Sequence, residues 1–289
     1  MTIHPSALIS PEAELADDVE VGPFAVLEGP VKVAAGTKIG GHVWLCGDTW
    51  LGEGSSVGWG SVIGANPQEL GFDPACRSGV RIGARNQIRE YVTIHRGSRA
   101  GGYTTLGEGN YLMTGVHLGH DSQVGDGNVI ANNVMFGGHV HLGNGAFLGG
   151  GGAFHQFIHI GDLAMVQGNA AASQDVPPYC VIRGVNQLAG LNTVGLRRAG
   201  FDASARAEIK KVYSLLFGSG LPLSQALEAA AAMAWSPAAQ RLLDSIAKPS
   251  RKGVIARGLR RWIPENTEEP SFGRNSMTNA TDWRSPTTP

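Results

Sequence analysis

Cysteine is scarce in this sequence, charge of neither sign prevails, and long hydrophobic runs are missing. Only Cys46, Cys76 and Cys180 occur in 289 residues, without metal-ligand spacing. This odd number argues against a disulfide framework and favours a reducing cytoplasm. The net charge of −1 argues against nucleic acid or an anionic membrane surface as a partner. With no bilayer-spanning run and no charged-then-apolar signal segment, we expect a cytoplasmic protein without stable membrane insertion.

What the sequence does contain is a branched or bulky apolar residue at every sixth position. One register runs from Ile3 to Ile63, a short one from Ile82 to Ile94, and a third from Leu106 to Val166. Neither a helix nor a single strand has this period, but the coils of a parallel β-helix built from hexapeptide repeats do. Glycine usually stands one or three residues after the apolar residue, as Gly52 and Gly125 do, which predicts corners with positive φ.

Two segments interrupt the repeat, and the register ends near residue 190. Segments 65–80 and 95–105 carry proline, glycine and charge, which is typical of loops that project from a regular scaffold. We therefore expect a β-helix over residues 1–190. A helical region should follow over 191–264, and the polar segment 265–289 is expected to be disordered.

Three helices are expected in the region after the repeat. The first should begin after Asp202 as its N-cap and end near Phe217, before two glycines. The second should cover 223–235. The third should have Ser236 as its N-cap and Pro237 at its first position.

Seven of the nine histidines lie between residues 95 and 159, and none occupies an inward position of the repeat. We expect their rings to point outward or to lie at corners. His141 and His159 are best interpreted as solvated surface residues. His120 is different because Asp121 follows it, and a carboxylate beside an imidazole can fix the tautomer that a general base needs.

Several motifs make the sequence similar to one enzyme family over residues 1–260. They include "IREYVTIHRG", "HLGHDSQVG", "GGHV", "FHQF", "QDVPPY" and "GLRRAGF". In this order and spacing they resemble the UDP-N-acetylglucosamine O-acyltransferases of lipid A biosynthesis, members of the hexapeptide-repeat acyltransferase superfamily. The resemblance implies a left-handed β-helix, a homotrimer, and transfer of a 3-hydroxyacyl chain from acyl carrier protein to the sugar 3-hydroxyl. No cofactor and no metal are expected.

The same resemblance assigns roles to individual residues. It makes His120 the general base, Asp121 the residue that orients it, and the N–H of Gly138 a donor to the oxyanion. The remaining positions are implied contacts of the sugar, the nucleotide or the acyl donor: Gln68, Glu69, His95, His117, His139, His155, Gln156, Asn192 and Arg198. The guanidinium of Arg198 can pair with a diphosphate through two parallel hydrogen bonds.

Three departures from the family pattern affect the nucleotide site. Gly71 stands where the family commonly has a lysine, Glu69 where it has aspartate, and Val194 where it has an acidic residue. Gly168 occupies the position that limits the depth of the family's acyl groove. Because glycine has no side chain, we expect a long 3-hydroxyacyl donor.

Other functions compete with acyl transfer to oxygen. The same base could serve an N-acyltransferase that acts on a 3-amino UDP-sugar. Left-handed β-helices of the γ-carbonic anhydrase type hold zinc with three histidines, but Asp121 and the nucleotide motifs fit acyl transfer better. A non-catalytic ice-binding surface would need a flat ladder of threonine or serine, which the sequence lacks.

Overall fold

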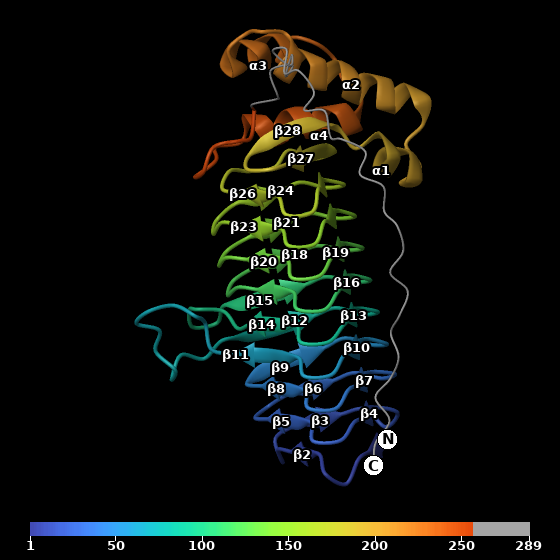
Figure 1. The fold of residues 1–289 in the computed structure, drawn as a ribbon, viewed down its shortest axis with the longest axis vertical. Coiled ribbons are helices and arrows are strands. Elements are labelled where there is room, and N and C mark those ends of the chain that lie inside the picture. The colour runs from blue at the N-terminus through green and yellow to red at the C-terminus, as the bar shows by residue number, and fades with distance from the viewer. Residues whose placement is uncertain (257–289) are drawn as a thin grey trace, which may run out of the picture. The chain divides into compact units, whose positions relative to one another are not determined.

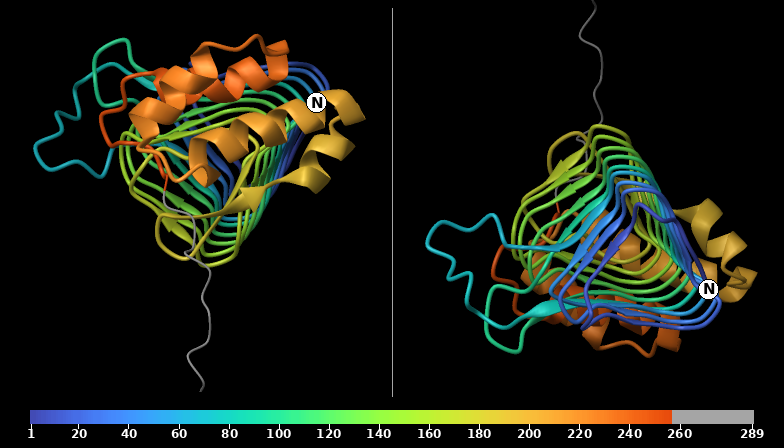
Figure 2. Two further views of the ribbon diagram at one scale, coloured as in Figure 1. Left: turned by 90° about the horizontal axis from the view of Figure 1, so that it is seen from above. Right: turned by 90° about the horizontal axis from the view of Figure 1, so that it is seen from below.

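A computed structural model describes residues 1–256. The repeat forms a triangular prism of stacked coils, and its three faces are sheets of parallel strands, one of which ends in an antiparallel strand (Figure 1, Figure 2). Ile3 pairs with Val21, and Val21 pairs with Ile39, so an uninterrupted coil takes 18 residues, or three hexads. This arrangement confirms the parallel β-helix expected from the period of six.

Each face of the prism is one sheet, and the three sheets take strands in rotation. Sheet A contains β1 (Thr2–Ile3), β4 (Glu20–Val21), β7 (Lys38–Ile39), β10 (Ser56–Val57), β13 (Gln87–Ile88), β16 (Tyr111–Leu112), β19 (Val129–Ile130), β22 (Phe147–Leu148), β25 (Met165–Val166), β27 (Cys180–Arg183) and β28 (Gln187–Leu191). Sheet B contains β2 (Leu8–Ile9), β5 (Val26–Glu28), β8 (Trp44–Cys46), β11 (Val62–Ala65), β14 (Thr93–His95), β17 (His117–Leu118), β20 (Met135–Phe136), β23 (Ala153–Phe154) and β26 (Ala171–Ala172). Sheet C contains β3 (Glu14–Leu15), β6 (Lys32–Val33), β9 (Asp48–Leu51), β12 (Gly79–Ile82), β15 (Tyr103–Leu106), β18 (Gln123–Val124), β21 (His141–Leu142) and β24 (His159–Ile160).

The residue at every sixth position forms the core of the prism. From Val21 to Val166 these side chains are at most 4% exposed, whereas Ile3 is 40% exposed because the first coil has no coil below it. A shared column of Ile, Leu, Val and Phe therefore holds the stack together, coil on coil.

The prediction that glycine serves corners with positive φ is confirmed three residues after the inward residue, as at Gly54 and Gly127, and is wrong one residue after it. Positive φ occurs three residues after the inward residue, where glycine, asparagine, histidine and aspartate all stand. Glycines one residue after it have no positive φ but lie against the next coil. A Cβ built on Gly52 would lie 2.4 Å from the carbonyl carbon of Gly83, and one on Gly125 would lie 2.4 Å from Asn144 Oδ1. Close approach of the coils is what selects glycine there.

Both interruptions leave the prism as loops, with narrower bounds than the sequence indicated. Segment 66–78 connects β11 to β12 and projects from the side of the prism (Figure 1), and segment 96–102 connects β14 to β15. Residues 103–105, expected to interrupt the repeat, belong to β15. Ile82 pairs with Leu106, so the second segment adds one hexad's length and leaves the inward register in phase.

Within residues 1–256, β28 is followed by four helices: α1 (Thr193–Arg198), α2 (Ala203–Gly218), α3 (Leu223–Ala231) and α4 (Pro237–Ala247). The Asp202 cap is confirmed, since its carboxylate accepts the N–H of Ala205 at 2.7 Å. The sequence did not predict α1. None of the helices among residues 1–256 is long and apolar enough to cross a membrane.

Two helix boundaries differ from those expected. α3 ends at Ala231 and not at Trp235, because the chain turns back and the Trp235 indole donates to the carbonyl of Ala230 at 2.8 Å. Ser236 and Pro237 do begin α4, but the Ser236 hydroxyl makes no capping hydrogen bond. The backbone N–H of Ser236 instead donates to the carboxylate of Glu208 in α2 at 2.8 Å, and this hydrogen bond joins α2 to α4. The predicted tail 265–289, and residues 257–264 of the expected helical region, lie outside the described residues.

Candidate active site

The corner between sheets B and C carries the histidine cluster. On three successive coils its corner residues are Asp121, His139 and Phe157, with φ values of 57°, 59° and 68°. This left-handed conformation costs a non-glycine residue roughly 1–2 kcal/mol, so the surrounding structure must hold these residues in place. The His139 and Phe157 rings stack with centroids 4.5 Å apart, and the Arg251 guanidinium lies 3.9 Å from the Phe157 centroid.

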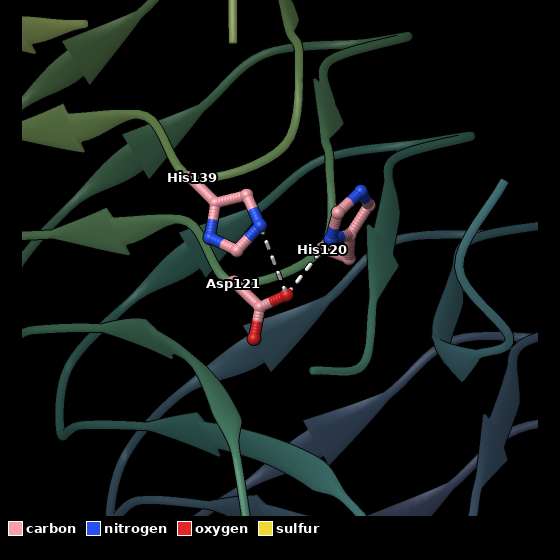
Figure 3. Close-up of side chains that lie close together, drawn as sticks. All are labelled: His120, Asp121 and His139. Atoms are coloured by element: carbon pink, nitrogen blue, oxygen red, sulfur yellow. Dashed lines mark hydrogen bonds and ion pairs between the residues drawn. The ribbon is translucent and has the colours of Figure 1, made fainter. Parts of the chain in front are cut away.

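His120 and Asp121 form a hydrogen-bonded pair at this corner. Nδ1 of His120 lies 2.8 Å from Oδ2 of Asp121, and both side chains are largely buried (Figure 3). The same oxygen accepts the N–H of Ser98 at 3.0 Å and lies 3.7 Å from Nε2 of His139. Because Nδ1 of His120 faces the carboxylate, its Nε2 is the nitrogen left to take up a proton.

Gly138 lies directly against the free edge of the His120 ring. A Cβ at position 138 would fall 2.5 Å from Nε2 of His120, so only glycine leaves the ring in this position. Among the described residues the N–H of Gly138 donates to no protein acceptor, although its carbonyl accepts the N–H of Phe157. A free donor beside the basic nitrogen is the arrangement that an oxyanion site requires.

The pKa shifts in the cluster favour an ionised Asp121 and neutral rings at His117 and His139. Burial opposes ionisation of Asp121, but hydrogen bonds from His120 and from the Ser98 N–H outweigh it and lower the pKa of Asp121. Burial lowers the pKa of His139, and burial together with the nearby His120 lowers that of His117. Neutral imidazoles can both donate and accept hydrogen bonds, as a sugar-binding site requires.

His95 is buried, although its ring was expected to point outward or to lie at a corner. It is 7% exposed, and its Nδ1 finds no hydrogen-bond partner among the described residues. His95 pairs with Ala65, where segment 66–78 leaves the prism, so an outward-facing position is covered. Burial lowers the pKa of His95 to about 4. Its ring meets that of His117 edge-on at 5.0 Å, and the His117 Nδ1 lies 2.7 Å from the Thr93 hydroxyl.

Other expected contacts lie around this cluster. Gln68 and Glu69 are exposed on segment 66–78, and the charge of Glu69 is close enough to raise the pKa of His139 against the larger effect of burial. Gly71 has a φ of 85° and no neighbour within 4 Å of a built Cβ, so no side chain stands in for the missing lysine.

His155 and Gln156 are exposed one coil above Gly138. A Cβ built on Gly137 would lie 2.8 Å from the Gln156 N, so the two coils are in close contact. His141 and His159 stack on sheet C, away from the cluster, with centroids 4.7 Å apart. The exposed side chain of His159 agrees with its interpretation as a solvated surface residue, whereas His141 is half-buried.

Asn192 and Arg198 are not brought to the histidine cluster within one chain. They line a cavity of about 760 Å³ at the corner between sheets C and A, whose floor includes Phe147 and Met165. The Asn192 side chain already caps α1 through Gly195 and donates to the carbonyl of Leu163, both at 2.9 Å. Arg198 is exposed. The implied nucleotide contacts are thus divided between two corners of the prism.

Gly168 lies at the third corner, between sheets A and B. It is exposed, and a Cβ there would meet only the carbonyl oxygen of Gly150, at 3.4 Å. A side chain at this position therefore projects outward and does not disturb the coil. The outer face of sheet B, with Met135 and Ala153, connects this corner to that of His120.

One set of metal-ligating groups occurs among residues 1–256, and it includes the hydrogen-bonded pair of His120 and Asp121. His120, Asp121 and His139 each offer a ligand atom within 4.8 Å of the others. Two imidazoles and a carboxylate form a zinc-type ligand set. However, Asp121 Oδ2 already accepts hydrogen bonds from His120 and Ser98, so a cation would have to displace them.

Several residues that shape the cluster were not singled out from the sequence. The Thr104 hydroxyl accepts the N–H of Asp121 at 2.8 Å, and the N–H of Ser98 reaches its carboxylate. Phe157 supports His139 by stacking. A backbone donor leaves no trace in the sequence. Phe157, in contrast, could have been found, since it stands 18 residues after His139, one coil further along the same corner.

Comparison with known proteins gives consistent matches over most of the chain. Residues 175–255 match the family described as "Udp N-acetylglucosamine O-acyltransferase; Domain 2", and residues 103–138 match the bacterial transferase hexapeptide family. The acyl-[acyl-carrier-protein]–UDP-N-acetylglucosamine O-acyltransferase of Thermodesulfovibrio yellowstonii is 41% identical over 78% of this chain and 88% of its own length. The enzyme of that name from Syntrophobacter fumaroxidans is 40% identical over 88% of this chain and 100% of its own length.

Solved structures agree with the sequence matches. The UDP-N-acetylglucosamine acyltransferase of Bacteroides fragilis superposes with a TM-score of 0.84 at 35% identity and covers 88% of this chain and 99% of its own. The enzyme from Moraxella catarrhalis superposes with a TM-score of 0.82 at 37% identity and covers 88% of this chain and 100% of its own. The likeness confirms the left-handed parallel β-helix followed by helices. The chain belongs to the acyl-[acyl-carrier-protein]–UDP-N-acetylglucosamine O-acyltransferase family.

Proposed function

We propose that the protein transfers a 3-hydroxyacyl chain from acyl carrier protein to the 3-hydroxyl of UDP-N-acetylglucosamine, the first step of lipid A biosynthesis. The observation that carries this proposal is the position of His120, whose Nδ1 is bound by Asp121 and whose Nε2 lies against Gly138. The names of the relatives support the same donor and acceptor.

In the proposed mechanism, Nε2 of His120 takes the proton of the sugar 3-hydroxyl as its oxygen attacks the thioester carbonyl. The carbonyl oxygen gains the negative charge of the tetrahedral intermediate, and the N–H of Gly138 stabilises it. The C–S bond then breaks, the carbonyl re-forms, and the departing thiolate takes the proton back from His120. Asp121 stabilises the imidazolium between these two steps.

The sugar nucleotide should bind between subunits. His117 and His139 line the sugar site beside His120, with His155 and Gln156 one coil above and Gln68 and Glu69 on segment 66–78. Asn192 and Arg198 would reach the nucleotide from a neighbouring copy, because they lie at another corner of their own prism. A cyclic trimer brings the two corners together three times.

Mixing of variants tests the shared site. His120→Ala and Arg198→Ala are each expected to be nearly inactive as homotrimers. When they are unfolded and refolded together, random assembly should restore about a quarter of the sites, because each site takes its two halves from different copies. Light scattering should give a trimer for both variants. A stable and active monomer, or no recovery in mixed trimers, would contradict the shared site.

The direct test of function is a transfer assay with purified protein. A panel of 3-hydroxyacyl carrier proteins is offered with UDP-N-acetylglucosamine or its 3-amino analogue, and the acylated sugar is identified by mass spectrometry. We expect O-acylation of UDP-N-acetylglucosamine, with long acyl chains preferred. Preference for the amine would support the N-acyltransferase, and a stoichiometric zinc content needed for activity would support a metal enzyme. Cytoplasmic location stays a prediction.

A further inference from the structure

The two segments that interrupt the repeat are joined by one buried arginine. Arg96 opens segment 96–102 and is only 9% exposed. Its guanidinium donates to Asn66 Oδ1 at 2.9 and 3.0 Å, to the Pro74 carbonyl at 2.9 Å, to the Ser78 hydroxyl at 3.1 Å and to the Cys76 carbonyl. All four acceptors belong to segment 66–78.

Arg96 has no carboxylate partner among the described residues. Taking a charge out of water is costly unless hydrogen bonds replace its hydration, so the neutral acceptors must stay in place for Arg96 to stay buried. A guanidinium presents its donors in a rigid planar fork, which fixes the relative positions of the groups it binds. The Phe72 ring, centred 5.0 Å from the guanidinium carbon, lies over it within the same segment. Arg96 therefore holds segment 66–78 in one conformation.

Backbone contacts extend this unit to the catalytic carboxylate. The Ser78 hydroxyl donates to the Gly97 carbonyl, and the N–H of Gly101 donates to the Arg77 carbonyl at 2.8 Å. From the segment fixed in this way, the N–H of Ser98 donates to Oδ2 of Asp121 at 3.0 Å. This is the oxygen that binds Nδ1 of His120.

We propose that Arg96 is a positioning residue that locks segments 66–78 and 96–102 together and so holds Asp121, and through it His120, in the geometry for catalysis. The proposal rests on the proposed function, because it assumes that His120 is the base. Since Gln68 and Glu69 lie on segment 66–78, the same contact would couple nucleotide-sugar binding to the orientation of the base.

The test compares Arg96→Gln and Arg96→Lys with Arg85→Gln in the full-length protein. Arg85 is a matched control, since its guanidinium is exposed and pairs with Glu108 away from both segments. Arg96→Gln should lower kcat roughly ten- to hundredfold, the effect of losing one hydrogen bond to a charged group, and should raise KM for the nucleotide sugar. Arg96→Lys should show a similar fall in kcat and rise in KM, because an ammonium group cannot reach acceptors that are spread over segment 66–78. Arg85→Gln should keep wild-type kinetics.

A double-mutant cycle separates this role from a general structural one. In an Asp121→Ala background, Arg96→Gln should still raise KM but should lower kcat less than about twofold further, because its effect on kcat acts through Asp121. An equal loss of kcat in both backgrounds would overturn the proposal. If Asp121→Ala itself leaves kcat unchanged, Asp121 does not orient the base and this inference fails, whereas the proposed function fails only if His120→Ala also keeps its kcat.

A second variant keeps the test independent of the folding of Arg96 variants. Ser98→Pro removes the N–H that reaches Asp121, whereas Ser98→Ala keeps it. The proline variant should lose at least tenfold more kcat than the alanine variant, and this difference should vanish in the Asp121→Ala background. Equal kcat values for the two Ser98 variants would show that the hydrogen bond does not position the base.

Discussion

A single methyl group at position 138 should displace the catalytic imidazole. In Gly138→Ala, the new Cβ would lie 2.5 Å from Nε2, 2.6 Å from Cε1 and 3.0 Å from Cδ2 of His120. Ordinary van der Waals contact begins at 3.4 Å. Because Gly138 does not have a positive φ, the backbone accepts alanine, and the His120 ring must move by about 1 Å.

A displacement of this size is expected to cost about a hundredfold in kcat, since reacting groups must stay in a near-attack geometry. Alanine keeps the backbone N–H of residue 138, so the oxyanion donor remains and the loss is assigned to His120. The free energy of unfolding should change little. Replacing glycine by alanine lowers the conformational entropy of the unfolded chain, which stabilises the fold by about 0.4–1 kcal/mol and offsets part of the cost of crowding the His120 ring.

The assay measures kcat for acyl transfer and the thermal midpoint for Gly138→Ala and for Gly218→Ala. Gly218 is the last residue of α2, has no positive φ, and has no neighbour within 4 Å of a built Cβ. Gly218→Ala should stay within about threefold of wild type in kcat. If Gly138→Ala does so as well while folded, the position of the His120 ring against Gly138 is not what catalysis depends on.

Three further perturbations test other parts of the account. Gly168→Met should lower kcat/KM roughly 5- to 150-fold for long 3-hydroxyacyl carrier proteins and spare short ones, whereas equal losses for all chain lengths would mean that the acyl chain runs elsewhere. Because burial holds the pKa of His95 at about 4 in the folded protein, below its ordinary value, stability should be lost as pH falls from about 6.5 to about 4, by up to ~1.4 kcal/mol per pH unit. Urea unfolding of wild type should show a steeper loss than His95→Gln, and equal slopes would contradict this. Asn110→Ala should lower the free energy of unfolding by about 1–3 kcal/mol, because Asn110 Oδ1 accepts two hydrogen bonds from Asn128 in the core, and exposed Asn132→Ala should cost under about 0.5 kcal/mol.

The sequence predicted the β-helix because its period has one physical cause. Every sixth residue points into the prism and must be apolar, so the inward register could be identified without any knowledge of pairing. The N-cap at Asp202 could also be predicted, because it depends on residues only three positions apart. The end of α3 could not be predicted, because it depends on the Trp235 indole turning back to the carbonyl of Ala230.

The candidate site could be predicted only where its parts are neighbours in the sequence. His120 and Asp121 are adjacent in the chain, and this adjacency was enough to indicate their hydrogen bond. The sequence could not indicate that Arg96 binds segment 66–78, because its four acceptors are 18 to 30 residues away and three of those five hydrogen bonds end on neutral side chains. It gave no sign that His95 is covered, since its hexad position is an outward one.

The division of the site among corners has a similar origin. The hexad register places the coils of the histidine cluster in order, whereas Arg198 lies on α1, after the last coil. The register also does not say which corners face each other between copies. Only the arrangement of whole prisms decides that, which is why the shared site is tested with mixed trimers.

The measurement that tests the central claim most directly is kcat of His120→Ala for transfer from a 3-hydroxyacyl carrier protein to UDP-N-acetylglucosamine. The side chain lies outside the apolar core, so the circular dichroism spectrum and the oligomeric state should match those of wild type. Loss of a general base costs about 10²–10⁴ in rate, and kcat should fall within that range. A folded His120→Ala protein that retains more than about a tenth of wild-type kcat would show that His120 is not the base.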